Sequence, residues 1–133
     1  MPDILRALSD LERQPWYSGG VARIEPLSSR APEYADPAEP LSAPLQRYLA
    51  AAGIERLYRH QAAMLDLCRA GRNVIVTTGT ASGKTLGFNL PVVESLDRDR
   101  NATALYLYPM KAVTQDQLRV LRELERFSAI PLG

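Results

Sequence analysis

The sequence predicts an α/β fold in which parallel strands alternate with flanking helices, preceded by a proline-rich N-terminal arm. Three observations indicate this class. Two short apolar runs rich in β-branched or aromatic residues occur at residues 73–77 and 102–108, and an amphipathic segment follows each run. Strand–helix–strand–helix order favours a parallel sheet. The third observation is that seven of the ten prolines lie within the first 44 residues.

Residues 1–44 are expected to form a short helix followed by an extended arm, and residues 45–133 an α/β lobe. The helix is predicted over residues 3–13, where Ile4, Leu5, Leu8 and Leu11 share one face. From there to residue 44, prolines and a pair of glycines prevent long regular elements. Aromatic side chains indicate that the arm docks on a surface, namely Trp16, Tyr17 and Tyr34.

Regular structure in the lobe is predicted to begin with two helices. The first starts near Ser42, a residue suited to capping, has Pro44 in its first turn and ends at Gly53. The second covers residues 60–70 and is closed by Gly71.

The strands and helices of the predicted α/β part follow in order. Residues 73–77 form an apolar run without alternating polarity, as expected of a buried parallel strand. A helix over residues 83–95 follows, broken or kinked at Pro91. The second strand, residues 102–108, leads into a long amphipathic helix over residues 111–127.

Composition and charge narrow the class of protein. A formal net charge of +1 gives no global basic field, so nucleic-acid binding would need a local site. One cysteine excludes an intrachain disulfide and argues against a metal cluster. No apolar run reaches the ~20 residues of a membrane span, and the N-terminus lacks the pattern of a secretory signal. These features predict a cytoplasmic protein in a reducing setting, without a membrane partner.

A phosphate-binding loop is predicted between the first strand and the next helix. It consists of Thr78, Gly79, Thr80, Ala81, Ser82, Gly83, Lys84 and Thr85. A strand–loop–helix corner directs backbone N–H groups and the positive end of the helix dipole at one point, where a triphosphate fits. Lys84 would reach the β- and γ-phosphates, and the Thr85 hydroxyl would ligate Mg²⁺. We therefore expect ATP and Mg²⁺ as cofactors, with Lys84 and Thr85 as the catalytic residues.

Two flanking segments carry further polar residues. A glutamine amide such as that of Gln61 can both donate to and accept from the edge of adenine, and Tyr58 or Arg59 could stack on the base. His60, the single histidine, is interpreted as a polar or helix-capping residue. Downstream, the helix start after the second strand could hold a nucleic-acid phosphate. The residues predicted to bind nucleic acid are Pro109, Met110, Lys111, Gln115 and Gln117.

Residues from about 45 to 121 resemble the first motor lobe of superfamily 2 helicases of the DEAD/DEAH-box type. The matches are a Q-type motif at residues 58–61, motif I at residues 78–85 and motif Ia at residues 108–112. Within that family the chain resembles the MrfA/YprA-like DNA-repair helicases. Met110 stands where that branch has threonine, which removes one hydroxyl contact to phosphate.

The resemblance implies a RecA-like P-loop NTPase lobe that binds ATP–Mg²⁺ against a second such lobe. It also implies movement along single-stranded nucleic acid, with DNA favoured over RNA. Hydrolysis in such motors needs an acidic pair after a later strand, and no such pair follows Lys111. We therefore expect a truncated ATP-binding lobe that is inactive in hydrolysis by itself and whose partner is the remainder of the motor.

Two alternatives remain open from the residues alone. The chain could be a nucleic-acid-binding module that responds to ATP without hydrolysing it. It could also be another P-loop enzyme, such as a small-molecule kinase, although no arginine-rich lid segment is evident.

Overall fold

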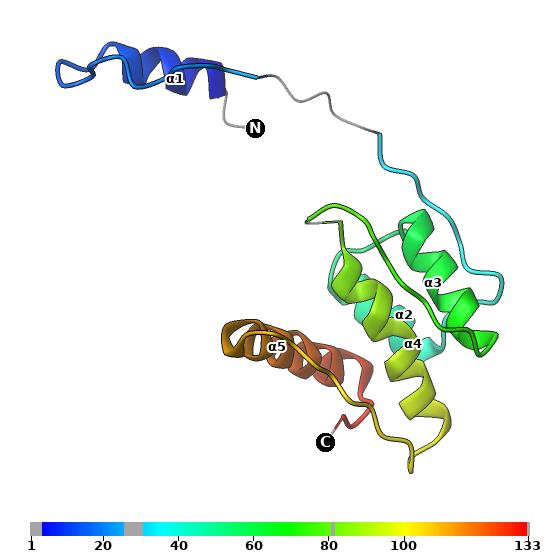
Figure 1. Cartoon of the computed structure of the whole chain (residues 1–133). Helices are drawn as coiled ribbons and strands as arrows, with labels where there is room; N and C mark the ends of the chain where they lie inside the picture. The colour runs from blue at the N-terminus through cyan, green and yellow to red at the C-terminus, as the bar shows by residue number, and fades with distance from the viewer. Residues whose placement is uncertain (1–3, 26–30, 81, 133) are drawn as a thin grey trace. The chain divides into compact units, whose positions relative to one another are not determined.

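The computed structural model describes residues 4–25, 31–80 and 82–132. The regular elements in these ranges are helices: α1 (Ile4–Glu12), α2 (Ala43–Ala51), α3 (Arg59–Arg69), α4 (Lys84–Arg98) and α5 (Lys111–Ser128) (Figure 1). The chain divides into two compact units, Met1–Ala31 and Pro32–Gly133. Residues 32–41, which the sequence assigned to the arm, therefore belong to the same unit as α2 to α5.

The first unit consists of α1 and the loop that follows it. The helix expected over residues 3–13 is confirmed at Ile4–Glu12, and none of its residues is buried. The backbone N–H of Val21 donates to the Tyr17 hydroxyl, which closes the loop, while the Trp16 side chain is 70% exposed. Within the described ranges, no helix has the length and apolar character needed to cross a bilayer.

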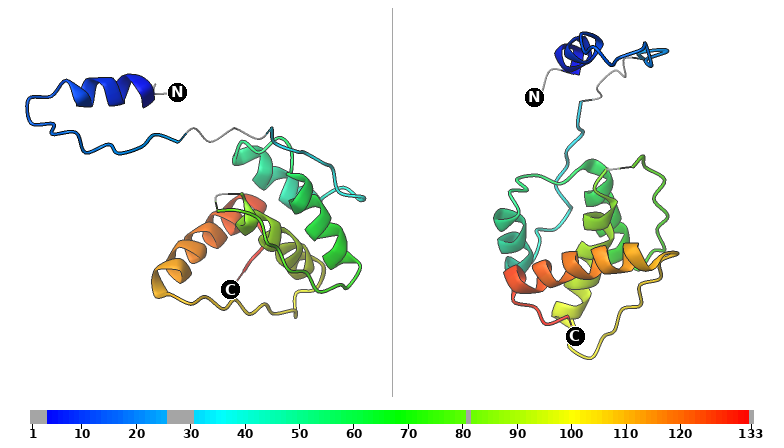
Figure 2. Two further views of the ribbon diagram at one scale, coloured as in Figure 1. Left: turned by 45° about the horizontal axis from the view of Figure 1, so that its top comes forward. Right: turned by 90° about the vertical axis from the view of Figure 1, so that its left-hand side faces the viewer.

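The second unit pairs α3 with α4 and α2 with α5 (Figure 2). Each helix contributes fully buried aliphatic side chains to one core, among them Leu45, Leu65, Leu90, Val93 and Leu124. The four helices lie close to where spacing predicted them. Ser42 occupies the N-cap of α2 as expected, but its side chain makes no capping hydrogen bond. Pro91 was expected to break or kink this helix; it does not break it, because α4 continues through this buried proline to Arg98.

Helices α3 and α4 approach closely at a glycine. A Cβ atom placed on Gly87 would lie 2.7 Å from the Met64 sulfur. Such a distance is shorter than van der Waals contact, so a larger residue at Gly87 would require the Met64 side chain to move. The approach fixes α4, and with it the loop that precedes α4, against the N-terminal half of α3.

The two predicted strands are not present as strands in the described residues. Backbone pairing outside helices is limited there to an isolated antiparallel bridge between Tyr34 and Tyr58. Residues 73–77 and 102–108 run between helices without hydrogen bonds to one another, and a strand exists only through pairing with a neighbour. Burial alternates along the first segment, since Val74 and Val76 are half-buried while Ile75 is 91% exposed. This period of two is that of extended backbone with one covered face.

Residues 32–41 dock on α3 through backbone hydrogen bonds. The N–H of Ala35 donates to the Leu57 carbonyl at 3.1 Å, and the N–H of Arg59 donates to the Glu33 carbonyl at 2.8 Å. Farther along, the carboxylate of Asp66 accepts from the N–H of Ala38 at 3.0 Å. Contacts near both ends of residues 32–41 therefore hold this segment against α3 and against the residues that precede α3.

A buried ion pair completes the attachment. The Arg69 guanidinium donates to the Glu94 carboxylate at 2.8 and 2.7 Å, and also to the carbonyls of Glu39 and Pro40. The Arg69 side chain is 11% exposed and that of Glu94 is 5% exposed. The hydrogen bonds from Arg69 lower the pKa of Glu94, whereas burial of the carboxylate raises it. One guanidinium thus joins α3, α4 and the docked segment.

Candidate functional site

The loop before α4 is organised around the Lys84 ammonium group. This group donates to the carbonyl of Thr78 at 2.9 Å, to the carbonyl of Gly79, and to the Ser82 hydroxyl at 3.3 Å. The hydroxyls of Thr78 and Ser82 are 2.7 Å apart. Ala81 lies outside the described residues. The side chain of Lys84 therefore folds over its own loop, and phosphate oxygens would compete with neutral carbonyls for the ammonium.

Gly83 turns the chain into α4. It occupies the N-cap position with φ +75°, a left-handed conformation that favours glycine, and no side chain caps the helix. A Cβ atom on Gly83 would also lie 2.5 Å from the Gln61 amide nitrogen. The N–H groups of the first turn of α4 therefore lack a side-chain acceptor and add positive potential at the loop.

Gln61 links the predicted base-contact motif to this loop. Its amide nitrogen donates to the Gly83 carbonyl at 2.8 Å, and its oxygen accepts from the backbone N–H of Tyr58 at 2.9 Å. The residue is 2% exposed. A glutamine amide has two N–H donors and two acceptor lone pairs, so these two bonds use one N–H donor and one acceptor lone pair. Gln61 thus bonds to the residue that precedes α4, and two hydrogen bonds fix its orientation.

The two predicted stacking residues have partners within the chain. The Tyr58 ring stacks on Tyr34, with centroids 5.3 Å apart, and on His60, with centroids 5.7 Å apart. Arg59 forms an ion pair with Glu33 at 2.9 Å on the exposed surface. His60 lies in the first turn of α3, as expected for a polar residue at a helix start.

Thr85, the predicted Mg²⁺ ligand, is half-buried in the first turn of α4, next to Lys84. No cluster of three or more acidic, histidine or cysteine side chains suited to a metal occurs in the described part of the chain.

The predicted nucleic-acid contacts surround the start of α5. Lys111 begins this helix after Met110 at its N-cap, and Pro109, Met110, Lys111 and Gln115 are exposed. The side-chain oxygen of Gln117 is buried without a hydrogen-bond partner in the described structure, so this residue points inward. Behind the helix start, the Tyr106 hydroxyl donates to the Asn89 side chain on α4 at 3.0 Å. This bond ties the segment before α5 to the helix that follows the phosphate loop.

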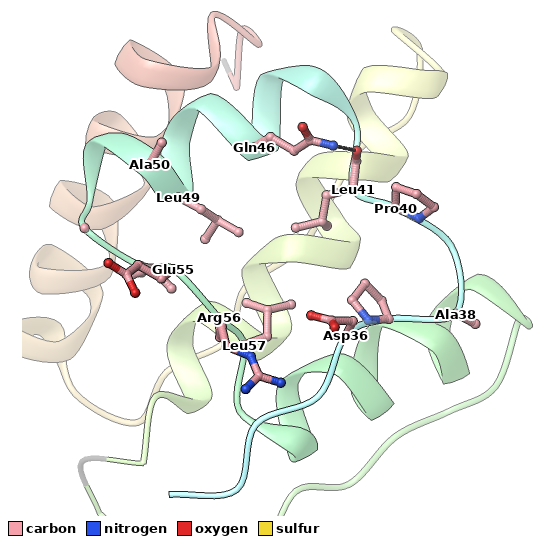
Figure 3. A pocket seen from close by; sticks show the side chains of 13 residues that line it. Asp36, Ala38, Pro40, Leu41, Gln46, Leu49, Ala50, Glu55, Arg56 and Leu57 are labelled. Carbon is pink, nitrogen blue, oxygen red and sulfur yellow. Dashed lines mark hydrogen bonds between the residues drawn. The ribbon is translucent and has the colours of Figure 1, made fainter.

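Two cavities border the docked segment. One, of about 460 Å³, is lined by Gln61, Gly83 and Leu86 together with Tyr34, Arg56 and Tyr58. The other, of about 790 Å³, lies between residues 36–41, α2 and residues 53–57 (Figure 3). In the latter, the Gln46 amide is already bonded to the Leu41 carbonyl at 2.7 Å. No residue that lines the larger cavity belongs to the phosphate loop. The smaller cavity borders the loop, because Gly83 lines it.

Comparison with known families decides the class of protein. The family model described as DEAD/DEAH box helicase matches residues 58–132, which is more than half of the chain. The chain belongs to the DEAD/DEAH box helicase family. The match begins at Tyr58 and includes the phosphate loop and the start of α5.

Individual helicases show the same relationship. The chain is 45% identical over 76 residues to the ATP-dependent helicase YprA of Bacillus subtilis (strain 168), covering 57% of this chain and 10% of YprA. It is 40% identical over 77 residues to the ATP-dependent helicase HRQ1 of Saccharomyces cerevisiae (strain ATCC 204508 / S288c), covering 58% of this chain and 7% of HRQ1. The chain thus spans about a tenth or less of the length of these curated relatives.

A solved helicase structure shares the fold. The crystal structure of the DUF1998 helicase MrfA bound to DNA and AMPPNP superposes with a TM-score of 0.78 and 32% identity. The alignment covers 95% of this chain and 17% of the MrfA chain. The likeness supports the RecA-like fold that the motifs predicted.

The smaller cavity in this helicase chain includes residues that were not foreseen from the sequence, among them Tyr34 and Arg56. Tyr34 reaches it through the bridge to Tyr58, a pairing across 24 positions that local patterns do not encode. The Arg56 guanidinium lies 5.3 Å from the centroid of the Tyr34 ring. The one available signal was an aromatic residue in an otherwise proline-rich stretch.

Proposed function

We propose that this chain binds ATP–Mg²⁺ and single-stranded nucleic acid as the N-terminal part of the first RecA-like lobe of an ATP-dependent DNA helicase. The observation that carries the proposal is the convergence of Lys84, Gln61 and the uncapped start of α4 on the same loop. An ammonium group, free helix N–H groups and an adenine-compatible amide together suit a nucleoside triphosphate.

In this proposal each predicted loop residue keeps its role. Lys84 exchanges its carbonyl contacts for the β- and γ-phosphates, and Thr85 ligates Mg²⁺. Backbone N–H groups from Thr78 to Gly83 surround the phosphates, and Gln61 contacts the base. Tyr58 and Arg59 lie near the proposed position of the base and hold the docked segment there. Tyr58 stacks on Tyr34, and Arg59 pairs with Glu33.

The nucleic-acid site is proposed at the start of α5. Lys111 and the N–H groups of the first helical turn hold a backbone phosphate, with Pro109, Met110, Gln115 and Gln117 around them. DNA is preferred over RNA in this proposal because MrfA was crystallised with DNA and the other relatives include DNA helicases. A rotation of Gln117 toward solvent would accompany binding.

The sheet and the second lobe belong to the proposed motor as well. Residues 73–77 and 102–108 become parallel strands when they pair with the further strands of a complete lobe. The hydrolytic acidic pair and a second RecA-like lobe would come from the remainder of the motor. DNA repair is the process that the resemblance to the MrfA/YprA-like branch suggests.

Equilibrium binding tests the nucleotide part of the proposal. The unmodified chain should bind a fluorescent ATP analogue in the presence of Mg²⁺, and Lys84→Ala should weaken binding at least about tenfold by removing the charge-assisted contacts. Unchanged affinity in Lys84→Ala would reject the assignment of the loop. The exposed Lys111→Ala serves as the matched control for loss of one lysine.

The same variants test the nucleic-acid part. Lys111→Ala should weaken binding of a single-stranded oligonucleotide and reduce its salt dependence by about one phosphate contact. Equal loss of oligonucleotide binding in Lys84→Ala would argue against separate sites. An ATPase assay with single-stranded DNA distinguishes a hydrolysing chain from a module that only binds.

A further inference from the structure

Helix α5 places its covered and its basic side chains on opposite faces. At 3.6 residues per turn, the covered side chains other than Glu125 fall within an arc of about 100°, Val113, Val120 and Leu124 among them. The basic side chains fall within an arc of about 80° on the other side of the helix. These basic residues, which we call the basic stripe, are Lys111, Arg119, Arg122 and Arg126.

The basic stripe is exposed and little used by the chain itself. Among the residues that the structure describes, no carboxylate forms an ion pair with Lys111, Arg122 or Arg126, and the Arg126 guanidinium lies 5.6 Å from the centroid of the neighbouring Phe127 ring. Arg119 pairs with Asp116 at 3.3 Å, but both side chains are about 70% exposed. An exposed pair of this kind contributes little stability, so an incoming anion can replace Asp116 at small cost.

The other acidic side chains of α5 have contacts away from the stripe. Glu125 accepts a hydrogen bond from the backbone N–H of Leu132 at 3.1 Å. Burial and the charge of Glu123 raise the pKa of Tyr48 on α2, so Glu123 lies toward α2, the helix on which α5 packs. Helix α5 has four basic and three acidic side chains, and it is therefore their separation, not a large net charge, that gives one face a positive potential.

The length of the stripe suits a polyanion with regularly spaced charges. Lys111 and Arg126 lie about 22 Å apart along the axis, at a rise of 1.5 Å per residue. A stacked nucleic-acid strand has one phosphate per 3.4 Å, so about six phosphates fit along the stripe. Guanidinium groups bind phosphate through two parallel N–H donors. Because the stripe begins at Lys111, the residue already proposed to hold a nucleic-acid phosphate, this continuity favours a nucleic acid over other polyanions.

We propose that the basic stripe binds the phosphate backbone of a nucleic-acid strand, so that the site at Lys111 extends along α5 to Arg126. The inference rests on the proposed function and adds Arg119, Arg122 and Arg126, which lie outside the predicted nucleic-acid contacts. Contacts to phosphates carry no sequence information, so the stripe adds affinity without a preference for particular bases.

Fluorescence anisotropy of the full chain with a labelled oligothymidylate of about 12 nucleotides tests the stripe. Arg122→Gln combined with Arg126→Gln should weaken binding severalfold. It should also reduce the slope of log affinity against log salt by about 1.4, since two phosphate contacts to a single strand are lost. The matched control, Arg13→Gln combined with Arg23→Gln, removes two exposed arginines of the first unit and should leave affinity and slope unchanged. Equal losses in the two double variants would reveal a general effect of net charge and overturn the stripe.

A purely structural role for the arginines is tested by Arg122→Lys combined with Arg126→Lys. Lysine keeps the charge, so the salt slope should stay near that of the unmodified chain. A slope as low as that of the glutamine variant would overturn the stripe. Two-dimensional NMR of the backbone amides tests its extent, because a dinucleotide should shift only amides near Lys111, whereas the longer strand should also shift those of residues 119–126. Shifts confined to the start of α5 with both ligands would contradict the proposal.

Lys111→Ala separates this inference from the function on which it depends. If Lys111→Ala weakens binding while the glutamine variant of Arg122 and Arg126 binds normally, the stripe is wrong and the site at the start of α5 stands. If the glutamine variant weakens binding and Lys111→Ala does not, the arginines bind the strand and the proposed site at the helix start fails. If the unmodified chain binds no oligonucleotide, both fail together.

Discussion

The side-chain amide of Gln61 on α3 donates a 2.8 Å hydrogen bond to the carbonyl of Gly83, the residue that starts α4. This single bond connects the base-contact motif to the phosphate loop across 22 positions of the sequence. A shift of Gly83 on phosphate binding would therefore move Gln61, and a base held by Gln61 would restrain the loop. The two halves of the proposed nucleotide site are joined by this hydrogen bond.

Gly83→Ala should destabilise the chain more than a comparable glycine substitution elsewhere. Both Gly83 and Gly53 have positive φ, and an alanine there costs about 1–2 kcal/mol from backbone strain. At Gly83 the new Cβ would also lie 2.5 Å from the Gln61 amide, whereas nothing lies within 4 Å of that position at Gly53. We expect the free energy of unfolding, measured in urea, to fall by about 1–3 kcal/mol more in Gly83→Ala than in Gly53→Ala. Equal losses would show that Gln61 adapts freely.

Gln61→Glu removes the hydrogen bond to the Gly83 carbonyl and keeps the shape of the side chain. A carboxylate still accepts from the N–H of Tyr58 but cannot donate to the Gly83 carbonyl, and its buried charge would face that carbonyl oxygen. Unfolding free energy should fall by about 1–3 kcal/mol near neutral pH. Gln46→Glu removes a similar bond, from an exposed glutamine of α2 to the Leu41 carbonyl, and is the control for burial because it should cost less stability. A variant as stable as the unmodified chain would contradict the observed bond.

Acid should lower the stability of the second unit, Pro32–Gly133, by protonating Glu94. Its hydrogen bonds to Arg69 hold the pKa of Glu94 below the ordinary value of about 4.3. A depressed folded-state pKa gives stability that is complete above the unfolded-state pKa and is lost as pH falls through the folded-state value. Urea unfolding at a series of pH values should therefore show a decline below about pH 4.3 that is smaller in Glu94→Gln. Asp116→Asn, in an exposed pair with Arg119, should match the unmodified decline.

Alkali should weaken the contact between Tyr106 and Asn89. Burial, together with the neighbouring Tyr108, raises the pKa of Tyr106 to about 12. The fold therefore favours the neutral phenol, and stability is complete below the unfolded-state pKa of about 10 and declines as pH rises toward the folded-state value. Tyr106→Phe should be less stable by about 1 kcal/mol at neutral pH, because a hydrogen bond is lost, and should lack this part of the alkaline decline. Tyrosinate absorbance measured against pH checks the titration directly.

The helices, and the loop that leads into α4, were predictable because their signals are local. Gly53 and Gly71 marked helix ends, and Lys111 was identified as the first residue of α5 from the turn before it. Contacts that depend on distant partners were not predictable. The docking of Tyr34 on Tyr58, across 24 positions, is such a contact. The return of the Lys84 ammonium to the Thr78 carbonyl is local, but it depends on how the loop folds, which the residue types do not specify. The two predicted strands are not confirmed in the described residues for the same reason, since apolar runs indicate a tendency to pair and pairing needs a partner.

The two extended segments have a practical consequence for work with the polypeptide in solution. Ile75, Leu105 and Leu107 are 91, 84 and 82% exposed, and they lie on backbone that is not paired within the described residues. Unsatisfied amides beside aliphatic side chains are templates for edge-to-edge aggregation between molecules. Purified samples should consequently lose solubility as concentration rises, and charged replacements at Leu105 and Leu107 offer a route to monodisperse material.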